Sequence, residues 1–406
     1  MASVAKRALY YNPIGRAGQA IALFALSLAL PWKAEASPAS EVMHYVDAEL
    51  RPFPEPRDSR PVAPNFLKAR FLARIADYRE RWTRLPQAKL RLTRFPRRGT
   101  SGPDVSLLRE RLGLSPDGSF DGELANAIEA FRADHGLSPG MHVDEALVAA
   151  LNRSPANYLA RLEQNAARLA MLPQDLPERF VLVDTASQQL LMFEGEKVVD
   201  TMRVVVGASD RQTPMMAAYL RFAEVDPYWH IPEDLVREDF APRVQRRGLG
   251  YLRRAGYEAV RLDGDSLVAI DPAKIDWAAV RRGDRALKMR QKPGPGNAMG
   301  RVKFMFPNAL GIYLHDTPQR GLLSRNVRLF SAGCVRLEDA GRLGEWLFGR
   351  DILAVRSMPA RRIDLKERVP VFITYFTAWP EDTGWSWRDD VYGRDTAPQV
   401  ARSPAP

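Results

Sequence analysis

The sequence has almost no cysteine: Cys334 is the single example among 406 residues. One cysteine excludes an intramolecular disulfide framework. In a chain that is exported to an oxidising compartment, a lone thiol either has a chemical role or is buried as a small hydrophobic side chain. The choice between these two interpretations depends on the residues around Cys334.

Long hydrophobic runs are also missing. The apolar run from Ala20 to Leu30 has about eleven residues, whereas a helix that spans a bilayer needs about 20. A basic leader precedes this run, and Ala34-Glu35-Ala36 follows it as a small-x-small cleavage site. We therefore expect residues 1–36 to be a signal peptide for export, with an uncleaved anchor as the alternative.

The sequence has no long block of lysine or arginine, although its formal net charge is +10. Residues 1–36 hold four basic side chains and one acid, a net +3, so the remaining chain carries about +7. Such a spread of positive charge in an exported protein suits an anionic envelope polymer or a membrane surface better than nucleic acid. Because metal-ligand spacings and glycine-rich phosphate loops are also missing, we expect no metal, no organic cofactor and no nucleic-acid partner.

The first part of the mature chain changes from an irregular to a helical pattern. Residues 37–64 are rich in proline and predict a linker or irregular arm. From Asn65 to Leu85, apolar residues recur at helical spacing and predict an amphipathic helix. We expect residues 37–100 to be a linker and helical scaffold, and residues 154–178 to be a helical connector.

Between these two segments, residues 101–153 show three successive helical faces. A turn at Asp117 to Gly122 separates the first two, and His135-Gly136-Leu137 ends the second helix with a glycine cap. This order of residues resembles the peptidoglycan-binding domain 1 family over about fifty residues. The resemblance implies a module that binds wall polymer, or one that serves only as a scaffold.

From Arg179 the pattern becomes that of strands. Short apolar runs alternate with turns and predict a mainly antiparallel sheet over residues 179–358. Residues 227–299 interrupt this pattern, and we interpret them as an inserted helical cap. The tail, residues 359–406, is rich in tryptophan and is predicted to pack on the β domain. The fold class is therefore a multidomain α+β fold, with a helical front region and a three-helix module before the β domain.

The most informative motif of the sequence lies around the lone cysteine. His315 closes a predicted strand, and Cys334 follows nineteen residues later. A thiol attacks acyl carbons as the thiolate, so it needs a nearby base, which His315 would supply. The amides of Gly333 and Cys334 would face a developing oxyanion, and Arg336 would lie near a carboxylate. Together these groups predict acyl transfer.

These residues carry a second resemblance. His315-Asp316-Thr317, followed by Ser331-Ala332-Gly333-Cys334-Val335-Arg336-Leu337, resembles the catalytic domain of the L,D-transpeptidase (YkuD) family, and the resemblance covers about Val181 to Val355. With its helical front end and its insertion, the chain resembles the YcbB-type murein L,D-transpeptidases of Gram-negative bacteria. That likeness implies a β-sandwich catalytic domain and a location in the periplasm. Ala332 departs from the histidine that much of the family has at this position.

The motif and the resemblance together predict seven site residues. They are Cys334 as nucleophile, His315 as general base and acid, Gly333 and the backbone of Asp316 for the oxyanion and for orientation, and Arg336, Ser331 and Tyr313 for the substrate. Two of these assignments have structural alternatives. Arg336 could equally form a structural ion pair, and Tyr313 could be a core aromatic.

The resemblance also implies a reaction. Cys334 would attack a peptidoglycan stem peptide after its third residue, release D-alanine, and pass the acyl group to the amine of a second stem as a 3→3 cross-link. Stem peptides and glycan are then the expected partners, and carbapenems are expected to acylate Cys334. Transfer to water would make the protein an L,D-carboxypeptidase. A non-catalytic wall-binding scaffold is the third interpretation.

Overall fold

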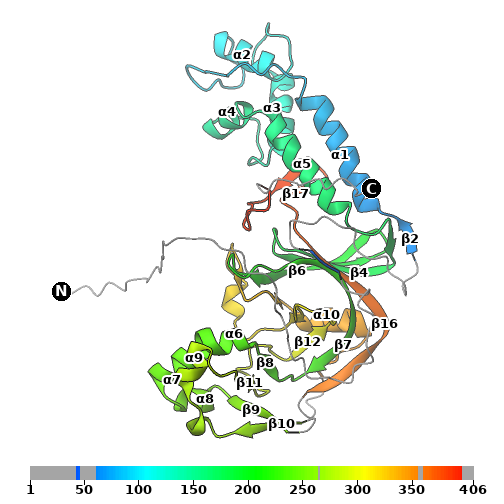
Figure 1. The fold of residues 1–406 in the computed structure, drawn as a ribbon. Helices are drawn as coiled ribbons and strands as arrows, with labels where there is room; N and C mark the ends of the chain where they lie inside the picture. Colours follow the sequence, from blue (N-terminus) through cyan, green and yellow to red (C-terminus); the bar gives the residue numbers. More distant parts are fainter. Residues whose placement is uncertain (1–42, 46–60, 264–265, 355–359, 396–406) are drawn as a thin grey trace, which may run out of the picture. The chain divides into compact units, whose positions relative to one another are not determined.

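A computed structural model describes residues 43–45, 61–263, 266–354 and 360–395 (Figure 1). The predicted signal peptide and most of the proline-rich arm lie outside these residues. Among the residues described, the helices are too short or too polar to cross a membrane. The described part is a mixed α+β structure with a large sheet, which agrees with the predicted fold class.

Among the described residues, five helices lie between Asn65 and Ala170, before the main strands of the large sheet. They are α1 (Phe66–Trp82), α2 (Pro103–Arg111), α3 (Gly122–Asp134), α4 (Glu145–Leu151) and α5 (Pro155–Leu169). The Asn65 side chain caps α1 by accepting the amide N–H of Lys68 at 2.9 Å. The apolar face of α1, with Phe71 and Tyr78 fully buried, packs against α5 and the tail. Helices α2 to α4 occupy the range predicted for the three-helix module.

A repeated loop, which sequence reasoning missed, joins these three helices. The buried Arg109 and Arg132 each donate Nε to the serine carbonyl six residues later, at 2.7 and 2.6 Å. Each also pairs at 3.1 Å with the aspartate twelve residues later. These aspartates, Asp121 and Asp144, are the N-caps of α3 and α4. One arginine therefore closes each turn and fixes the start of the next helix.

His135 lies in the core where α3 ends. Its Nδ1 is 2.7 Å from the carbonyl oxygen of Phe131, and its Nε2 is 3.0 Å from the hydroxyl of Tyr78. Because a carbonyl only accepts, Nδ1 carries the proton and Nε2 accepts from the tyrosine. Burial lowers the pKa of His135 to about 3. The histidine is thus a neutral structural residue.

The pairing of the main strands in the large sheet is continuous and closed, because the last strand, β16, also pairs with β7. Its main strands are β4 (Arg179–Asp184), β5 (Gln189–Glu194), β6 (Lys197–Gly207), β7 (Met215–Val225), β12 (Val302–Met305), β13 (Leu314–His315), β15 (Val335–Leu337) and β16 (Arg361–Thr374). The long strand β16 pairs with β4 on one side and with β7 on the other, where its register shifts between Asp364 and Val369 (Figure 1). Strand β16 therefore joins both ends of one sheet, and the finer prediction of a β-sandwich stays a prediction.

Short strands complete the sheets. They are β1 (Met43–Tyr45) beside β7, β14 (Leu329–Ser331) beside β6, and the pair β2 (Pro61–Pro64) and β3 (Asp175–Pro177). Most pairings in the large sheet are antiparallel, as predicted. The pairings β4–β16, β6–β14 and β13–β15 are parallel, and the last of them forms the candidate active site.

The insertion, residues 227–299, contains its own sheet and not helices alone. Its helices are α6 (Glu233–Leu235), the π-helical η2 (Val236–Phe240), α7 (Ala241–Arg247), α8 (Gly250–Arg254), η3 (Pro272–Lys274) and α9 (Trp277–Arg282). Its strands β8 (Trp229–Ile231), β9 (Tyr257–Asp263), β10 (Ser266–Ile270) and β11 (Lys288–Gln291) pair in the order β10-β9-β11-β8. The predicted helical cap is corrected accordingly. Exposed charged residues on β9 and half-buried charged residues on β11 hid the strand pattern.

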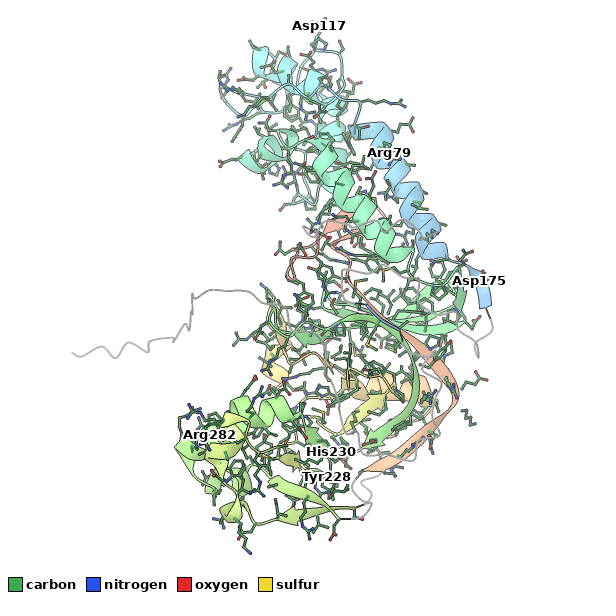
Figure 2. All side chains as sticks on the ribbon, in the orientation of Figure 1. Arg79, Asp117, Asp175, Tyr228, His230 and Arg282 are labelled. Atoms are coloured by element: carbon green, nitrogen blue, oxygen red, sulfur yellow. The ribbon has the colours of Figure 1, made fainter. Side chains whose placement is uncertain are left out.

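The insertion has a hydrophobic core separate from that of the large sheet. The buried Asn297 holds its two ends together by donating Nδ2 to the carbonyls of Pro227 and Lys292 at 3.0 and 2.9 Å. Tyr228 and His230 lie at its start (Figure 2), where the guanidinium of Arg290 stacks 4.5 Å from the ring of Tyr228.

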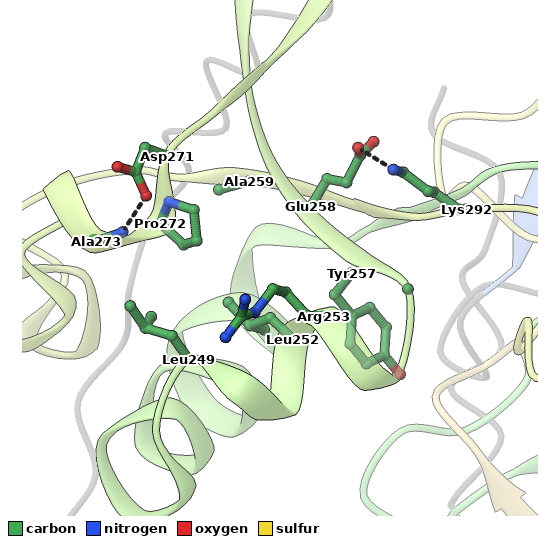
Figure 3. A pocket seen from close by; sticks show the side chains of 11 residues that line it. Leu249, Leu252, Arg253, Tyr257, Glu258, Ala259, Asp271, Pro272, Ala273 and Lys292 are labelled. Atoms are coloured by element: carbon green, nitrogen blue, oxygen red, sulfur yellow. Dashed lines mark hydrogen bonds and ion pairs between the residues drawn. The ribbon is translucent and has the colours of Figure 1, made fainter.

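A cavity of about 480 Å³ lies within the insertion, between α8, β9 and η3 (Figure 3). Glu258 lines it and pairs with Lys292 at 2.8 Å. None of the seven predicted site residues lines this cavity.

The tail packs on the helices as well as on the sheet. After β16 it forms the hairpin β17 (Ala378–Pro380) and β18 (Trp385–Trp387). The ring of Trp385 lies 5.1 Å from that of Phe71 in α1, and Trp387 donates Nε1 to the carbonyl of Asp134 at 2.9 Å. The prediction that the tail packs on the β domain is thus incomplete, because its tryptophans mainly cover the helical region. Helix α10 (Ala340–Phe348) packs against β16.

The buried His135 predicts a loss of stability in acid. Its pKa is about 3 when folded and about 6.5 when unfolded, so only the unfolded chain binds a proton between these values. Its contribution is therefore complete above pH 6.5 and is lost as the pH falls toward 3. We expect His135→Gln to be less stable than wild type at pH 7, but to lose less stability between pH 7 and 4.5, measured by urea unfolding. The exposed His142→Gln is the matched control, and an equal loss in both variants would contradict the assignment.

Candidate active site

The parallel pairing of β13 with β15 brings the predicted nucleophile and base together. Leu314 lies opposite Val335, and His315 lies opposite Arg336. Directly paired side chains share a face of the sheet, and so do residues two apart on one strand. His315 and Arg336 therefore lie on the same face, and Cys334 directly precedes β15, although nineteen residues separate the histidine from the cysteine.

A row of charged side chains crosses the sheet at this point. Lys303 of β12 lies opposite His315, and Glu224 of β7 lies opposite Lys303. The ammonium of Lys303 is 2.9 Å from the carboxylate of Glu224. Sequence reasoning assigned no role to either residue, although a lysine between apolar neighbours on a buried strand was a usable signal. The row places two cations, Lys303 and Arg336, on either side of His315.

His315 has the geometry of a neutral base. It is 2% exposed, and its Nδ1 lies 2.6 Å from the carbonyl oxygen of Asp316. Because this oxygen only accepts, Nδ1 carries the proton and Nε2 keeps its lone pair. Burial, followed by the positive charges of Arg336 and Lys303, lowers the pKa of His315 to about 3.

Asp316 is fixed through its side chain while its carbonyl orients His315. One carboxylate oxygen accepts the amide N–H of Arg301 at 2.8 Å, and the other accepts from Arg320 at 2.5 Å. The predicted orienting role of the Asp316 backbone thus has a structural basis.

Cys334 is half-buried, and its Sγ lies 3.6 Å from the carbonyl oxygen of Gly311. Burial raises the pKa of its thiol to about 11, although hydrogen bonds with Tyr313 and the charges of Arg336 and Lys303 act in the opposite direction. The cysteine and the histidine are therefore both neutral near pH 7. The thiol needs His315 to take its proton during attack.

The residues before Cys334 form a tight loop. Gly333 has φ +117°, and a Cβ at this position would lie 3.2 Å from Ile312. Its N–H donates to the Ser331 hydroxyl at 3.1 Å, which donates to the carbonyl of Cys334 at 2.6 Å. The N–H of Cys334 donates to no other residue that the structure describes. The oxyanion role of Gly333 and the substrate role of Ser331, both of which would compete with these bonds, stay predictions.

Tyr313 and Arg336 both lie near His315. The ring of Tyr313 lies 5.7 Å from that of His315, and the tyrosine forms hydrogen bonds with Cys334 and Trp229. Arg336 donates Nη1 to the amide oxygen of Gln319 at 2.8 Å. Its Nε is buried without an acceptor, and it pairs with no acidic side chain among the described residues. The alternative of a structural ion pair for Arg336 is therefore disfavoured.

Comparison with known sequences identifies the domain. A model of the L,D-transpeptidase catalytic domain, YkuD, matches residues 178–373. Residues 178–373 therefore resemble an L,D-transpeptidase catalytic domain. The match contains all seven predicted site residues and the insertion.

A relative supports the same assignment. A candidate L,D-transpeptidase of Haemophilus influenzae is 32% identical over 248 residues, which cover 59% of this chain and 49% of that protein. The chain therefore spans about half the length of this relative.

Solved L,D-transpeptidases show only a distant likeness. An enzyme from Mycobacterium smegmatis is 13% identical over 48% of this chain and 58% of its own, with a TM-score of 0.25. L,D-transpeptidase 1 of Mycobacterium tuberculosis is 14% identical over 48% of this chain and 60% of its own, with a TM-score of 0.21.

The pKa of His315 predicts an unusual pH profile. Because this histidine stays neutral down to about pH 3, the acylation rate of Cys334 should be nearly constant from pH 8 to pH 5. A base with an ordinary pKa of 6.5 would instead lose about thirtyfold over this range. Intact-mass kinetics with a carbapenem would measure the rate, and a midpoint near pH 6.5 would contradict the prediction.

A double variant provides the control for this profile. Lys303→Met combined with Glu224→Gln removes one cation that lowers the pKa of His315 without leaving its partner charged. We expect the acid limb of the double variant to move to higher pH.

Proposed function

We propose that this chain is a cysteine-dependent L,D-transpeptidase that joins peptidoglycan stem peptides by 3→3 links. The observation that carries the proposal is the register of β13 against β15, which pairs His315 with Arg336, two residues after Cys334. The catalytic domain of residues 178–373 supports the same reaction class.

The first half of the reaction forms a thioester. The thiol of Cys334 gives its proton to Nε2 of His315 while Sγ attacks the carbonyl carbon of the third stem residue. The N–H of Cys334 lies next to the resulting oxyanion. When the intermediate collapses, the carbon–nitrogen bond breaks, and His315 returns the proton to the departing amine of D-alanine.

The second half transfers the acyl group. The amine of a second stem attacks the thioester carbon and loses a proton to Nε2 of His315. The carbon–sulfur bond then breaks, and the sulfur takes the proton back. Both halves use the same neutral histidine, so no cofactor takes part in the scheme. If water attacks in place of the amine, the same steps give an L,D-carboxypeptidase.

Charge around the site favours an anionic donor. Arg336 and Lys303 flank His315, and among the described residues only Lys303 has an acidic partner, Glu224. Stem peptides carry free carboxylates, for which the unpaired guanidinium of Arg336 is a suitable partner. This supports the predicted substrate role of Arg336.

The insertion favours transfer to an amine over transfer to water. Its residue Trp229 hydrogen-bonds Tyr313, which in turn contacts the thiol of Cys334. A cavity of about 590 Å³ separates its last turn, Pro293 to Pro295, from the loop after His315. An insertion at this place would limit the access of water to the thioester.

The rest of the chain is consistent with work on the cell wall. We propose that residues 101–153 bind glycan or hold the catalytic domain near it, that the chain is of the YcbB type, and that the leader directs it to the periplasm. The net positive charge of about +7 outside the leader, from +10 for the whole sequence, also suits an anionic polymer.

Purified muropeptide tetrapeptides test the proposed reaction. We expect the mature protein to produce a 3→3 dimer and free D-alanine, detected by mass spectrometry, and Cys334→Ala to produce neither. Because Cys334 is half-buried and its thiol donates a long hydrogen bond of 3.6 Å to the carbonyl of Gly311, the variant should keep the wild-type melting temperature.

The other outcomes are also distinct. A tripeptide without dimer would favour the L,D-carboxypeptidase. An unchanged substrate together with no carbapenem adduct at Cys334 would contradict both enzymatic functions. A variant that unfolds would instead identify Cys334 as a core residue.

A further inference from the structure

A single hydroxyl holds the loop that carries the nucleophile. Thr213 is fully buried, and its Oγ1 donates to the carbonyl oxygen of Gly333 at 2.7 Å. Oγ1 of Thr213 also accepts the amide N–H of Gly207 at 2.9 Å. The end of β6 and the nucleophile loop, residues 331–334, therefore share one hydroxyl.

The bonded carbonyl belongs to the peptide unit that carries the N–H of Cys334. A trans peptide is planar, and its C=O and N–H point in opposite directions. When Thr213 fixes the oxygen of Gly333, it also fixes the direction of the Cys334 N–H. This N–H has no acceptor among the described residues.

Tyr392 of the tail forms hydrogen bonds with the backbone of Thr213 and of Gly207. Its hydroxyl donates to the carbonyl of Gly207 at 2.8 Å and accepts the amide N–H of Thr213 at 3.4 Å. A side chain on Gly207 has no space, since a Cβ there would lie 2.2 Å from the carbonyl oxygen of Arg211. Tyr392 is 8% exposed and stacks on Tyr375, with the ring centroids 5.5 Å apart.

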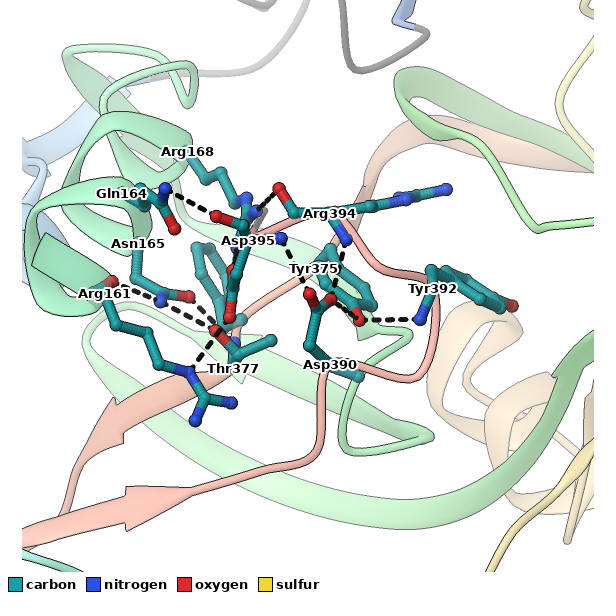
Figure 4. A network of polar contacts seen from close by, with 12 residues as sticks. Arg161, Gln164, Asn165, Arg168, Tyr375, Thr377, Asp390, Tyr392, Arg394 and Asp395 are labelled. Carbon is teal, nitrogen blue, oxygen red and sulfur yellow. Dashed lines mark hydrogen bonds and ion pairs between the residues drawn. The ribbon is translucent and has the colours of Figure 1, made fainter. Parts of the chain in front are cut away.

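The tail around Tyr392 is itself anchored on α5 (Figure 4). The carboxylate of Asp395 pairs with Arg168 at 2.7 Å and with Arg161 at 2.9 Å. The neighbouring residue Arg394 donates Nη2 to the carbonyl of Thr213 at 3.1 Å. A continuous set of polar contacts thus joins α5, the tail and the nucleophile loop.

We propose that Thr213 and Tyr392 are positioning residues that orient the Cys334 N–H toward the oxyanion, and that the tail holds them in place from α5. The inference rests on the proposed function and deepens it. Neither residue needs to touch the substrate, because both act through the peptide between Gly333 and Cys334.

The proposal predicts that the same substitution affects two reactions of the Cys334 thiol differently. Acylation of Cys334 passes through an oxyanion and needs the oriented N–H. Alkylation by iodoacetamide needs the thiolate but forms no oxyanion. Loss of the positioning hydroxyl should therefore slow the first reaction and leave the second unchanged.

Three variants of the full chain, each compared with wild type in both reactions, test the proposal. For Thr213→Val we expect acylation by a carbapenem to fall about tenfold, with alkylation within about twofold of wild type. Thr213→Ser keeps the hydroxyl and should restore acylation. Tyr392→Phe keeps the ring and should give a smaller fall of about threefold, seen in kcat more than in KM.

Thr377→Val is the matched control. Thr377 links the same tail to α5 through Asn165, at 2.9 Å, but does not contact Thr213 or Gly207. It should lower the melting temperature without changing the ratio of the two rates.

The remaining outcomes overturn the proposal. These are a parallel fall in both rates, an unchanged acylation rate, or a serine variant that restores nothing. A wild-type protein that is alkylated but never acylated would contradict the proposed function itself, and this is seen before any variant is compared.

Discussion

The parallel pairing of β13 with β15 is the constraint on which the site depends. In a sheet that is otherwise mainly antiparallel, it places His315 beside Arg336, two residues after Cys334. The closed path through β16 surrounds this pair with buried strands. A shift of one residue would turn the histidine to the opposite face and separate base from nucleophile. The chemistry of the site is therefore a property of strand register.

The same register sets the charge of the site. Burial, reinforced by the charges of Arg336 and Lys303 on either side, lowers the pKa of His315 and keeps the imidazole neutral, while burial raises the pKa of Cys334 and keeps it as a thiol. A neutral pair avoids the cost of separated charges in a partly dry site. The two cations then stabilise the negative charge that develops on sulfur and oxygen during attack, so that their effect is greatest in the transition state.

The motif around the lone cysteine was easier to recognise in the sequence than the architecture of the sheet. His315 and Cys334 stood out because a short motif encodes them, and the strands of the β domain followed from their apolar runs. The closed sheet depends on an irregularity within β16 that leaves no local pattern. Thr213 and Tyr392 were missed because their contact joins residues 179 apart, through buried hydroxyls that resemble ordinary core polar groups. The arginine loops of the helical module were visible as a repeat but were not recognised.

The charge state of His315 tests this account most directly. In reduced protein with ¹⁵N-labelled histidine, NMR would follow the two ring nitrogens of His315 from pH 8 to pH 4, with His315→Gln to assign the signals. The account predicts a neutral ring with the proton on Nδ1 over this whole range. An imidazolium signal at pH 7, which would indicate a preformed thiolate–imidazolium pair, would contradict it.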